Sequence, residues 1–102
     1  MAAGLVLRFP GLTRAEYEAV NNKLNIDMNT GAGDWPAGLL SHAGGEADGA
    51  LVVIEIWESR EAQGRFMQGQ LGRALHDAGV TVMPEITWVD LIAYHTPGKV
   101  PA

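Results

Sequence analysis

Cysteine is absent from this chain of 102 residues, and positively charged residues are few. The missing cysteine excludes disulfide bonds, a thiolate nucleophile and cysteine-based metal sites, and it is compatible with a reducing compartment. Seven lysines and arginines stand against twelve aspartates and glutamates, for a net charge of −5. Because nucleic-acid-binding proteins gather cations on one face, we expect no nucleic acid partner.

Long hydrophobic runs are also missing. No apolar stretch approaches the roughly 20 residues that span a bilayer, and the N-terminus lacks a basic start followed by a long apolar core. We therefore expect a cytoplasmic protein with no membrane partner. Hydrophobic residues make up 47% of the chain and charged residues 19%, which is ordinary globular composition. The length predicts one domain over residues 1–102, small enough to benefit from a partner subunit.

Apolar alternation predicts four β-strands. The first ends at the turn signal Pro10-Gly11, and the third is an eight-residue apolar run before Trp57. A turn rich in glycine and acidic residues is expected between the second and third strands, from Gly44 to Gly49. The predicted strands cover residues 5–9, 38–43, 49–57 and 85–95.

Two helices are marked by their starts and stops. Thr13 and Glu16 form a capping box, which predicts a helix from about residue 14 to Leu24. Ser59 is a good N-cap for a second, longer helix, which Gly79 ends. This second helix contains three internal glycines, so either close backbone packing or room for a ligand is expected along it.

Residues 25–37 form a long loop for so small a domain. The segment is rich in asparagine, aspartate and glycine and has no periodic pattern. Met28 and Trp35 are apolar side chains within it, which indicates that the loop folds back over something. Loops of this length are often functional lids.

The predicted element order is β-α-β-β-α-β, the arrangement of ferredoxin-like α+β domains. Right-handed crossovers place the antiparallel strands in the order 4-1-3-2, with both helices on one face of the sheet. The third strand is apolar on both faces, with Ile54 on one and Val53 on the other. The face without helices therefore needs a cover. A second copy of the chain is the simplest cover, and we expect a homodimer.

The junction between the third strand and the second helix has the form Glu55-x-Trp57-x-Ser59-x-Glu61-Ala62. Together with the element order and the helix that follows, this stretch resembles the dimeric α+β barrel superfamily, especially its antibiotic-biosynthesis-monooxygenase-like members. The resemblance covers nearly the whole chain in pattern. It implies that two sheets face each other to form a dimeric α+β barrel.

The same resemblance implies a cavity between the sheet and the helices of each subunit, lined by Trp57. Members of the superfamily include cofactor-free oxygenases and cyclases that act on aromatic polyketides, as well as haem-degrading enzymes. Histidines that often occur in the second helix of the monooxygenases are not matched here: Gln68 and Gln70 occupy its middle, and His76 lies near its end. This departure argues against haem ligation, and we expect no cofactor.

Strand alternation gathers three charged residues on one predicted face of the sheet. Arg8 lies on the first strand, Glu55 on the third and Asp90 on the fourth, so the predicted strand order puts Arg8 between the two carboxylates. Two interpretations are open. The charges form a paired ion network at a dimer interface. Alternatively, they line a pocket in which burial and a like-charged neighbour raise the pKa of one carboxylate, so that it acts as a general acid or base.

Histidine and aromatic residues complete the candidate site. His42, in the second strand, could move a proton near neutral pH or could be a satisfied residue at the rim. The three histidines of the chain follow no ligand spacing, so no metal site is expected. Six aromatic residues could frame a flat apolar ligand, although core packing explains several of them equally well. They are Tyr17, Trp35, Trp57, Phe66, Trp88 and Tyr94.

The first function hypothesis is an enzyme of secondary metabolism. It holds an aromatic or polycyclic, polyketide-like intermediate between Trp57, Trp88 and the loop that carries Trp35. The reaction is either cofactor-independent oxygenation or acid–base cyclisation or isomerisation.

In this hypothesis Glu55, Asp90 or His42 moves a proton, and Arg8 steadies a developing enolate or phenolate. The second hypothesis is a ligand-binding or stress-associated barrel without turnover. There the charged residues only hold the sheet together.

Overall fold

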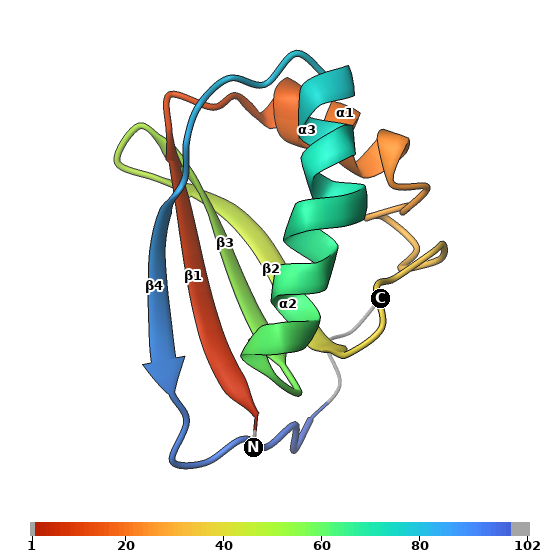
Figure 1. Cartoon of the computed structure of the whole chain (residues 1–102). Helices are drawn as coiled ribbons and strands as arrows, with labels where there is room; N and C mark the ends of the chain where they lie inside the picture. The colour runs from red at the N-terminus through yellow and green to blue at the C-terminus, as the bar shows by residue number, and fades with distance from the viewer. Residues whose placement is uncertain (1, 99–102) are drawn as a thin grey trace.

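A four-stranded antiparallel sheet carries helices on one of its faces (Figure 1). The structure is a computed structural model that describes residues 2–98. The strands are β1 (Ala3–Pro10), β2 (Leu39–Ala47), β3 (Ala50–Trp57) and β4 (Glu85–Asp90). The helical elements are α1 (Arg14–Lys23), α2 (Arg60–Phe66), η1 (Met67–Leu71) and α3 (Gly72–Asp77).

The strand order is β2-β3-β1-β4, which confirms the predicted ferredoxin-like arrangement. The β2–β3 hairpin turns more tightly than expected, because Ala47 already pairs with Ala50. Asp48 and Gly49 form the whole turn, with φ angles of 51° and 73°. An Asp-Gly pair is suited to a two-residue hairpin turn of this kind. The predicted turn from Gly44 to Gly49 was therefore too long, and β2 continues through most of it.

The fourth strand is shorter than predicted. It ends at Asp90, which pairs with Ala3 at the beginning of β1. Because β4 is an edge strand with β1 as its single neighbour, it has no further residue of β1 to pair with. Residues 91–95, including Tyr94, consequently lie outside the sheet.

The register corrects the faces assigned from strand alternation. Leu5 pairs with Glu55 in β3, and directly paired residues point to the same side of a sheet. Arg8 pairs with Val52 and therefore lies on the opposite side from Glu55. The side with Glu55 holds the hydrophobic core under the helices, formed by buried residues of β1 and β3: Leu5, Leu7, Phe9, Leu51, Val53 and Trp57.

Helix α1 begins as the sequence predicts. The Thr13 hydroxyl accepts a hydrogen bond from the Glu16 backbone N–H at 3.1 Å, and the Thr13 N–H donates to the Glu16 carboxylate at 3.0 Å. Both arms of the capping box are thus present. The cap fixes the start of α1, and with it the side of the helix that faces the sheet.

The second helix is one continuous rod with a π-helical turn in its middle, which the sequence did not indicate (Figure 1). Gly72 follows that turn, and a Cβ atom there would lie 2.9 Å from the Met67 carbonyl oxygen. Gly64 and Gly69 have open space where a side chain would begin. Close packing between elements therefore does not explain these glycines. Within residues 2–98, the helices are too short or too polar to cross a membrane.

Candidate functional site

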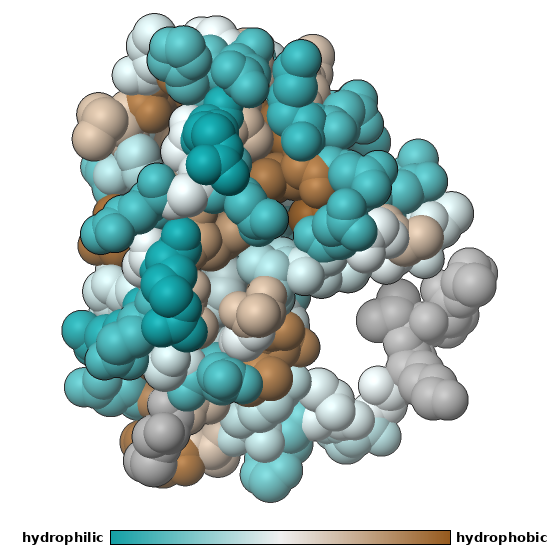
Figure 2. All heavy atoms as spheres, turned by 45° about the vertical axis from the view of Figure 1, so that its right-hand side comes forward, coloured by the Kyte–Doolittle hydropathy of each residue, from teal (hydrophilic) through white to brown (hydrophobic). Residues whose placement is uncertain are grey.

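A cavity of about 60 Å³ lies between the helix-bearing face of the sheet and the helices. Apolar side chains make up most of its wall, among them Leu7 and Phe9 from β1 and Phe66 from α2. Five residues add polar groups: Tyr17, Asn21, Trp35, His42 and Glu55. In Figure 2, apolar atoms are visible at the bottom of a recess that polar side chains surround. A largely apolar hollow with a few polar groups is the usual form of a small-molecule site.

A chain of hydrogen bonds crosses the wall of this cavity. The Trp57 indole N–H donates to Glu55 Oε1 at 2.9 Å. The other carboxylate oxygen of Glu55 lies 2.7 Å from His42 Nδ1, and His42 Nε2 lies 2.7 Å from the Tyr17 hydroxyl. Direct pairing of His42 with Glu55 across β2 and β3 sets the middle of the chain.

The donors and acceptors fix the direction of this chain. An indole N–H can only donate, so Glu55 Oε1 accepts. When the His42 imidazole is neutral, a carboxylate at Glu55 accepts its Nδ1 proton as well, and Nε2 is then the acceptor for the Tyr17 hydroxyl. The side chains of His42 and Glu55 are 10% and 7% exposed, so water competes little for these bonds. The arrangement is an oriented proton path that ends at the Tyr17 oxygen.

Tyr17 is the member of the path that α1 brings to the cavity. Burial raises the pKa of its phenol above 10.0, and the nearby Glu55 charge acts in the same direction, while the amide of Asn21 partly offsets both. The phenol is therefore protonated at neutral pH. Its ring stacks on the His42 ring, with the planes within 6° and the centroids 6.2 Å apart. Gly44 makes room for it, because a Cβ at position 44 would collide with the phenol.

Asn21 lies one helical turn after Tyr17 on α1. The residue is 6% exposed and lines the cavity. Its Nδ2 atom lies near the Tyr17 oxygen, but it makes no hydrogen bond of good geometry with any residue the structure describes. A buried amide donor without a partner costs about 1–3 kcal/mol. The cavity thus contains one polar group whose bonding is incomplete.

The loop between α1 and β2 closes one side of the cavity. Trp35 lines the cavity from this loop, and its ring centroid lies 5.6 Å from that of His42. Its indole N–H donates to the Gly31 carbonyl at 2.8 Å. A bridge between Ile26 and Gly33 holds the loop in a compact shape. The loop folds back over the cavity wall through Trp35, as expected, whereas Met28 does not line the cavity.

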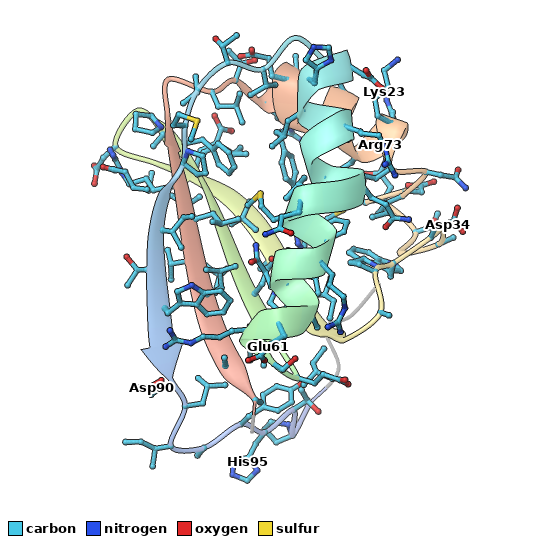
Figure 3. The ribbon with its side chains drawn as sticks, viewed as in Figure 1. Lys23, Asp34, Glu61, Arg73, Asp90 and His95 are labelled. Carbon is cyan, nitrogen blue, oxygen red and sulfur yellow. The ribbon has the colours of Figure 1, made fainter. Side chains whose placement is uncertain are left out.

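Two of the four candidate catalytic residues lie outside the cavity. Arg8 pairs with Glu85 at 2.7 Å on the other face of the sheet. Asp90, with a side chain 96% exposed, pairs with Arg60 at 3.2 Å; Figure 3 shows it at the end of β4. The expected meeting of Arg8 with Glu55 and Asp90 was wrong. The register turns Arg8 away from Glu55, and it pairs Asp90 with Ala3 at the beginning of β1, while Arg8 pairs with Glu85.

Three of the six candidate aromatic residues line the cavity, and three do not. Tyr17, Trp35 and Phe66 line the cavity. Trp57 is fully buried in the core and does not line it, contrary to what the resemblance implied. The remaining two, Trp88 and Tyr94, do not line it either.

Trp88 and Tyr94 have other surroundings. The Arg60 guanidinium lies 5.0 Å from the centroid of the Trp88 ring, a cation–π contact at the edge of the sheet. Tyr94 belongs to the segment after β4 and is half-buried there. Trp88 packs against the core cluster from β4, which is an edge strand as predicted, and Tyr94 lies beyond the end of that strand.

Sequence reasoning missed Asn21 and the pairing of His42 with Glu55. The signal for the pair was present: counting outward from a two-residue turn at Asp48-Gly49 puts His42 opposite Glu55. Asn21 could have been found from its spacing, since it follows Tyr17 by four residues and shares its helix face. Among residues 2–98, no group of three metal-ligating side chains occurs.

Solved structures share this architecture. Rv0793 from Mycobacterium tuberculosis superposes with a TM-score of 0.66 at 18% identity, over 94% of this chain and 100% of that one. SnoaB from Streptomyces nogalater, a cofactor-independent oxygenase, gives 0.61 at 18% identity, over 96% and 98%. An antibiotic biosynthesis monooxygenase gives 0.62 at 13% identity, over 89% and 99%. The fold is that of the antibiotic-biosynthesis-monooxygenase-like proteins.

This likeness confirms the fold that the strand-to-helix junction indicated. No protein-family model matches the sequence, and no curated protein matches it. Identities below 25% support a shared architecture and say little about a shared reaction. Function has to be argued from the cavity itself.

Proposed function

We propose that the protein is an enzyme that binds a flat, largely apolar small molecule between its sheet and helices. In this proposal the path from Glu55 through His42 to Tyr17 moves a proton to or from that molecule. The observation that carries the proposal is the path itself: three titratable side chains joined by hydrogen bonds in the wall of an apolar cavity. Groups arranged in this way are typical of acid–base catalysis.

The first chemical step is the removal of a proton from a carbon that a carbonyl group makes acidic, either as its direct neighbour or by conjugation through an aromatic ring. The Tyr17 oxygen takes this proton while its own proton passes to His42 Nε2. An enolate forms on the ligand, and an imidazolium forms beside the Glu55 carboxylate, which stabilises it. Glu55 also keeps the imidazole in the orientation that presents Nε2 to Tyr17.

Two reactions follow from this step, and neither needs a cofactor. In oxygenation the electron-rich enolate reduces dioxygen; a methylene carbon loses two hydrogens and gains one oxygen atom, and the other oxygen atom leaves as water. Without dioxygen, the enolate is protonated elsewhere or attacks a carbonyl group, which gives isomerisation or cyclisation. The similarity of the fold to SnoaB, a cofactor-independent oxygenase, supports the first reaction.

The substrate class is an aromatic or polycyclic, polyketide-like intermediate. Tyr17, Trp35 and Phe66 offer it aromatic surfaces. The cavity of about 60 Å³ is smaller than the roughly 300 Å³ of sites for larger ligands. Binding therefore includes outward movement of the loop that carries Trp35. Its ends are Asn25 and Gly38, whose φ angles are 60° and 90°.

A turnover assay with anthrone tests the enzyme proposal. Anthrone has three fused rings and a methylene carbon opposite its ketone, and oxygenation gives anthraquinone and water. We expect the protein to form anthraquinone faster than buffer does, with consumption of one dioxygen per product. In Glu55→Gln the amide can donate to His42 Nδ1, which turns the Nε2 proton toward Tyr17 and removes the acceptor from the path. We expect this change to lower the rate about 100-fold.

Glu46→Gln is the matched control, because it makes the same chemical change on an exposed residue of β2. Its rate should equal that of the wild type. Equal rates for wild type, Glu55→Gln and Glu46→Gln would contradict the proposed path. Tight binding of anthrone with no product under air or nitrogen would instead favour a ligand-binding barrel without turnover.

We also propose that the protein works as a homodimer. The face of the sheet opposite the helices exposes apolar side chains, with Ile54 54% and Val89 43% exposed. Val6, Val52 and Ile56 lie on the same face and are partly buried. A contiguous apolar face on a small domain favours association, and a second copy offers a matching surface.

A further inference from the structure

The amide of Asn21 is costly where it stands. It is 6% exposed, lines an apolar cavity and has an Nδ2 donor without a partner among the described residues. Leucine at this position would have higher helix propensity and no unsatisfied donor. The nearby Tyr17 oxygen is the one structural reason for asparagine here, and it leaves Nδ2 without a hydrogen bond of good geometry. The missing partner of Nδ2 points to a molecule that enters the cavity.

The other polar groups of the cavity already have partners. The Tyr17 hydroxyl is bonded to His42, and His42 is bonded to Glu55. The Trp35 indole N–H donates to the Gly31 carbonyl. Of the side-chain donors that line this part of the described structure, Nδ2 of Asn21 is the one left for a ligand.

The spacing on α1 places this donor beside the proton path. Tyr17 and Asn21 are four residues apart and share one face of the helix. A ligand oxygen that accepts from Nδ2 would therefore lie close to the Tyr17 oxygen. Charge that develops on this ligand oxygen would be held by Nδ2 at the moment the proton leaves.

The residues around Asn21 also determine which kind of ligand oxygen the cavity can accept. Among residues 2–98, no lysine or arginine lines the cavity, and Arg8 lies on the other face of the sheet. Glu55 and the apolar walls disfavour a ligand that arrives with a full negative charge. A neutral amide donor suits a neutral carbonyl oxygen, and it strengthens its bond as that oxygen becomes an enolate.

We infer that Asn21 is a binding residue that receives the ketone oxygen of the substrate through Nδ2. The substrate is then a neutral aromatic ketone whose carbonyl oxygen lies at α1, next to Tyr17. This inference rests on the proposed function, because it assumes that the cavity holds a small molecule.

Two probe molecules distinguish the contribution of the carbonyl oxygen to binding from that of the rings. α-Tetralone is an aromatic ketone with two fused rings, and tetralin is the hydrocarbon of the same shape without the oxygen. Their affinities are measured by nuclear magnetic resonance titration of the full chain. In Asn21→Leu we expect α-tetralone to bind about tenfold more weakly, while tetralin binds as well as before or better.

Asn22→Leu is the matched control, because it makes the same change at an exposed neighbour on α1. It should alter neither affinity. The melting temperature of Asn21→Leu should equal or exceed that of the wild type, whereas a structural role for Asn21 would lower it. Asn21→Asp provides a second variant, since it keeps the size of the side chain but removes the amide donor, and it should weaken α-tetralone binding as well.

An unchanged affinity of Asn21→Leu for α-tetralone would overturn the inference, and continued tetralin binding in that case would leave the proposed cavity function standing. Loss of both probes in Asn21→Leu would also overturn it, because it would mean a change of cavity shape. Failure of the wild type to bind either probe would overturn the proposed function together with this inference.

Discussion

At the scale of single residues, the most informative side chain is Tyr17. It contacts His42 through its hydroxyl, rests over Gly44 and lines the cavity. Because its pKa is raised by burial, the folded protein holds the phenolic proton more firmly than the unfolded chain does. The stabilising effect of this difference is fully present below the ordinary pKa of 10.0 and is lost as the pH rises from there through the folded pKa.

The direction of the Tyr17 pKa shift gives a prediction for unfolding at alkaline pH. We expect the free energy of unfolding of the wild type to fall between pH 9 and roughly pH 11 more steeply than that of Tyr17→Phe, which has no proton to lose at this position. At pH 8 the variant should be less stable by about 1 kcal/mol, because it lacks the hydrogen bond to His42. Urea unfolding over this pH range measures both quantities.

Tyr94→Phe is the matched control, since it removes a phenol outside the cavity. Its pH dependence should follow that of the wild type. If Tyr17→Phe lost stability with pH as steeply as the wild type, the alkaline decline would come from other groups.

At the scale of elements, the π-helical turn η1 distinguishes the second helix from an ordinary amphipathic one. Its hydrogen bonds span one residue more than those of an α-helix, which changes the side chains of α3 that face the cavity, among them Leu75. Gly72 permits this turn, because any side chain there would press on the Met67 carbonyl oxygen. Turns of this kind are frequent at functional sites.

Two glycine substitutions test this explanation. Gly64→Ala adds a methyl group in open space and should stabilise the protein by about 0.5–1 kcal/mol through helix propensity. Gly72→Ala gains the same helix propensity, but its new Cβ would lie only 2.9 Å from the Met67 carbonyl oxygen, and this close contact cancels the gain. The free energy of unfolding of Gly72→Ala should therefore be no higher than that of the wild type. Chemical unfolding measures both; equal stabilisation would show that η1 does not depend on a glycine at position 72.

At the scale of the whole molecule, the sheet has one face under helices and one face without them (Figure 1). The register puts the charged and hydrogen-bonded residues of the cavity under the helices, and it puts Ile54 and Val89 on the uncovered face. The two faces therefore have different roles in the proposal: the covered face forms the ligand site, and the uncovered face joins two copies.

The proposed homodimer makes a direct prediction. Ile54→Lys puts a charge in the middle of the uncovered face, where burial against a second copy would be costly. We expect the wild type to sediment as a dimer and Ile54→Lys to sediment as a folded monomer in analytical ultracentrifugation. Met28→Lys changes an exposed apolar residue of the loop on the other side and should remain a dimer. A monomeric wild type at micromolar concentration would contradict the proposal.

The sequence predicted those parts of the fold and site that depend on local patterns. The capping box of Thr13 and Glu16 fixed the start of α1, and the order of apolar segments led to the strand order. His42 and Glu55 were recognised as candidate acid–base residues because of their side-chain chemistry. Their partnership was missed, because it depends on the hairpin register. A turn misplaced by a few residues hides that register.

The sequence by itself determined the elements, their order and the class of fold, since capping, periodicity and turn chemistry act between residues close together in the chain. Only the tertiary structure decided which side of the sheet each strand residue faces. A shift of one residue in pairing reverses the two faces. That choice moved Arg8 out of the cavity, enclosed Trp57 in the core and brought Tyr17 and Asn21 of α1 to His42 and Glu55.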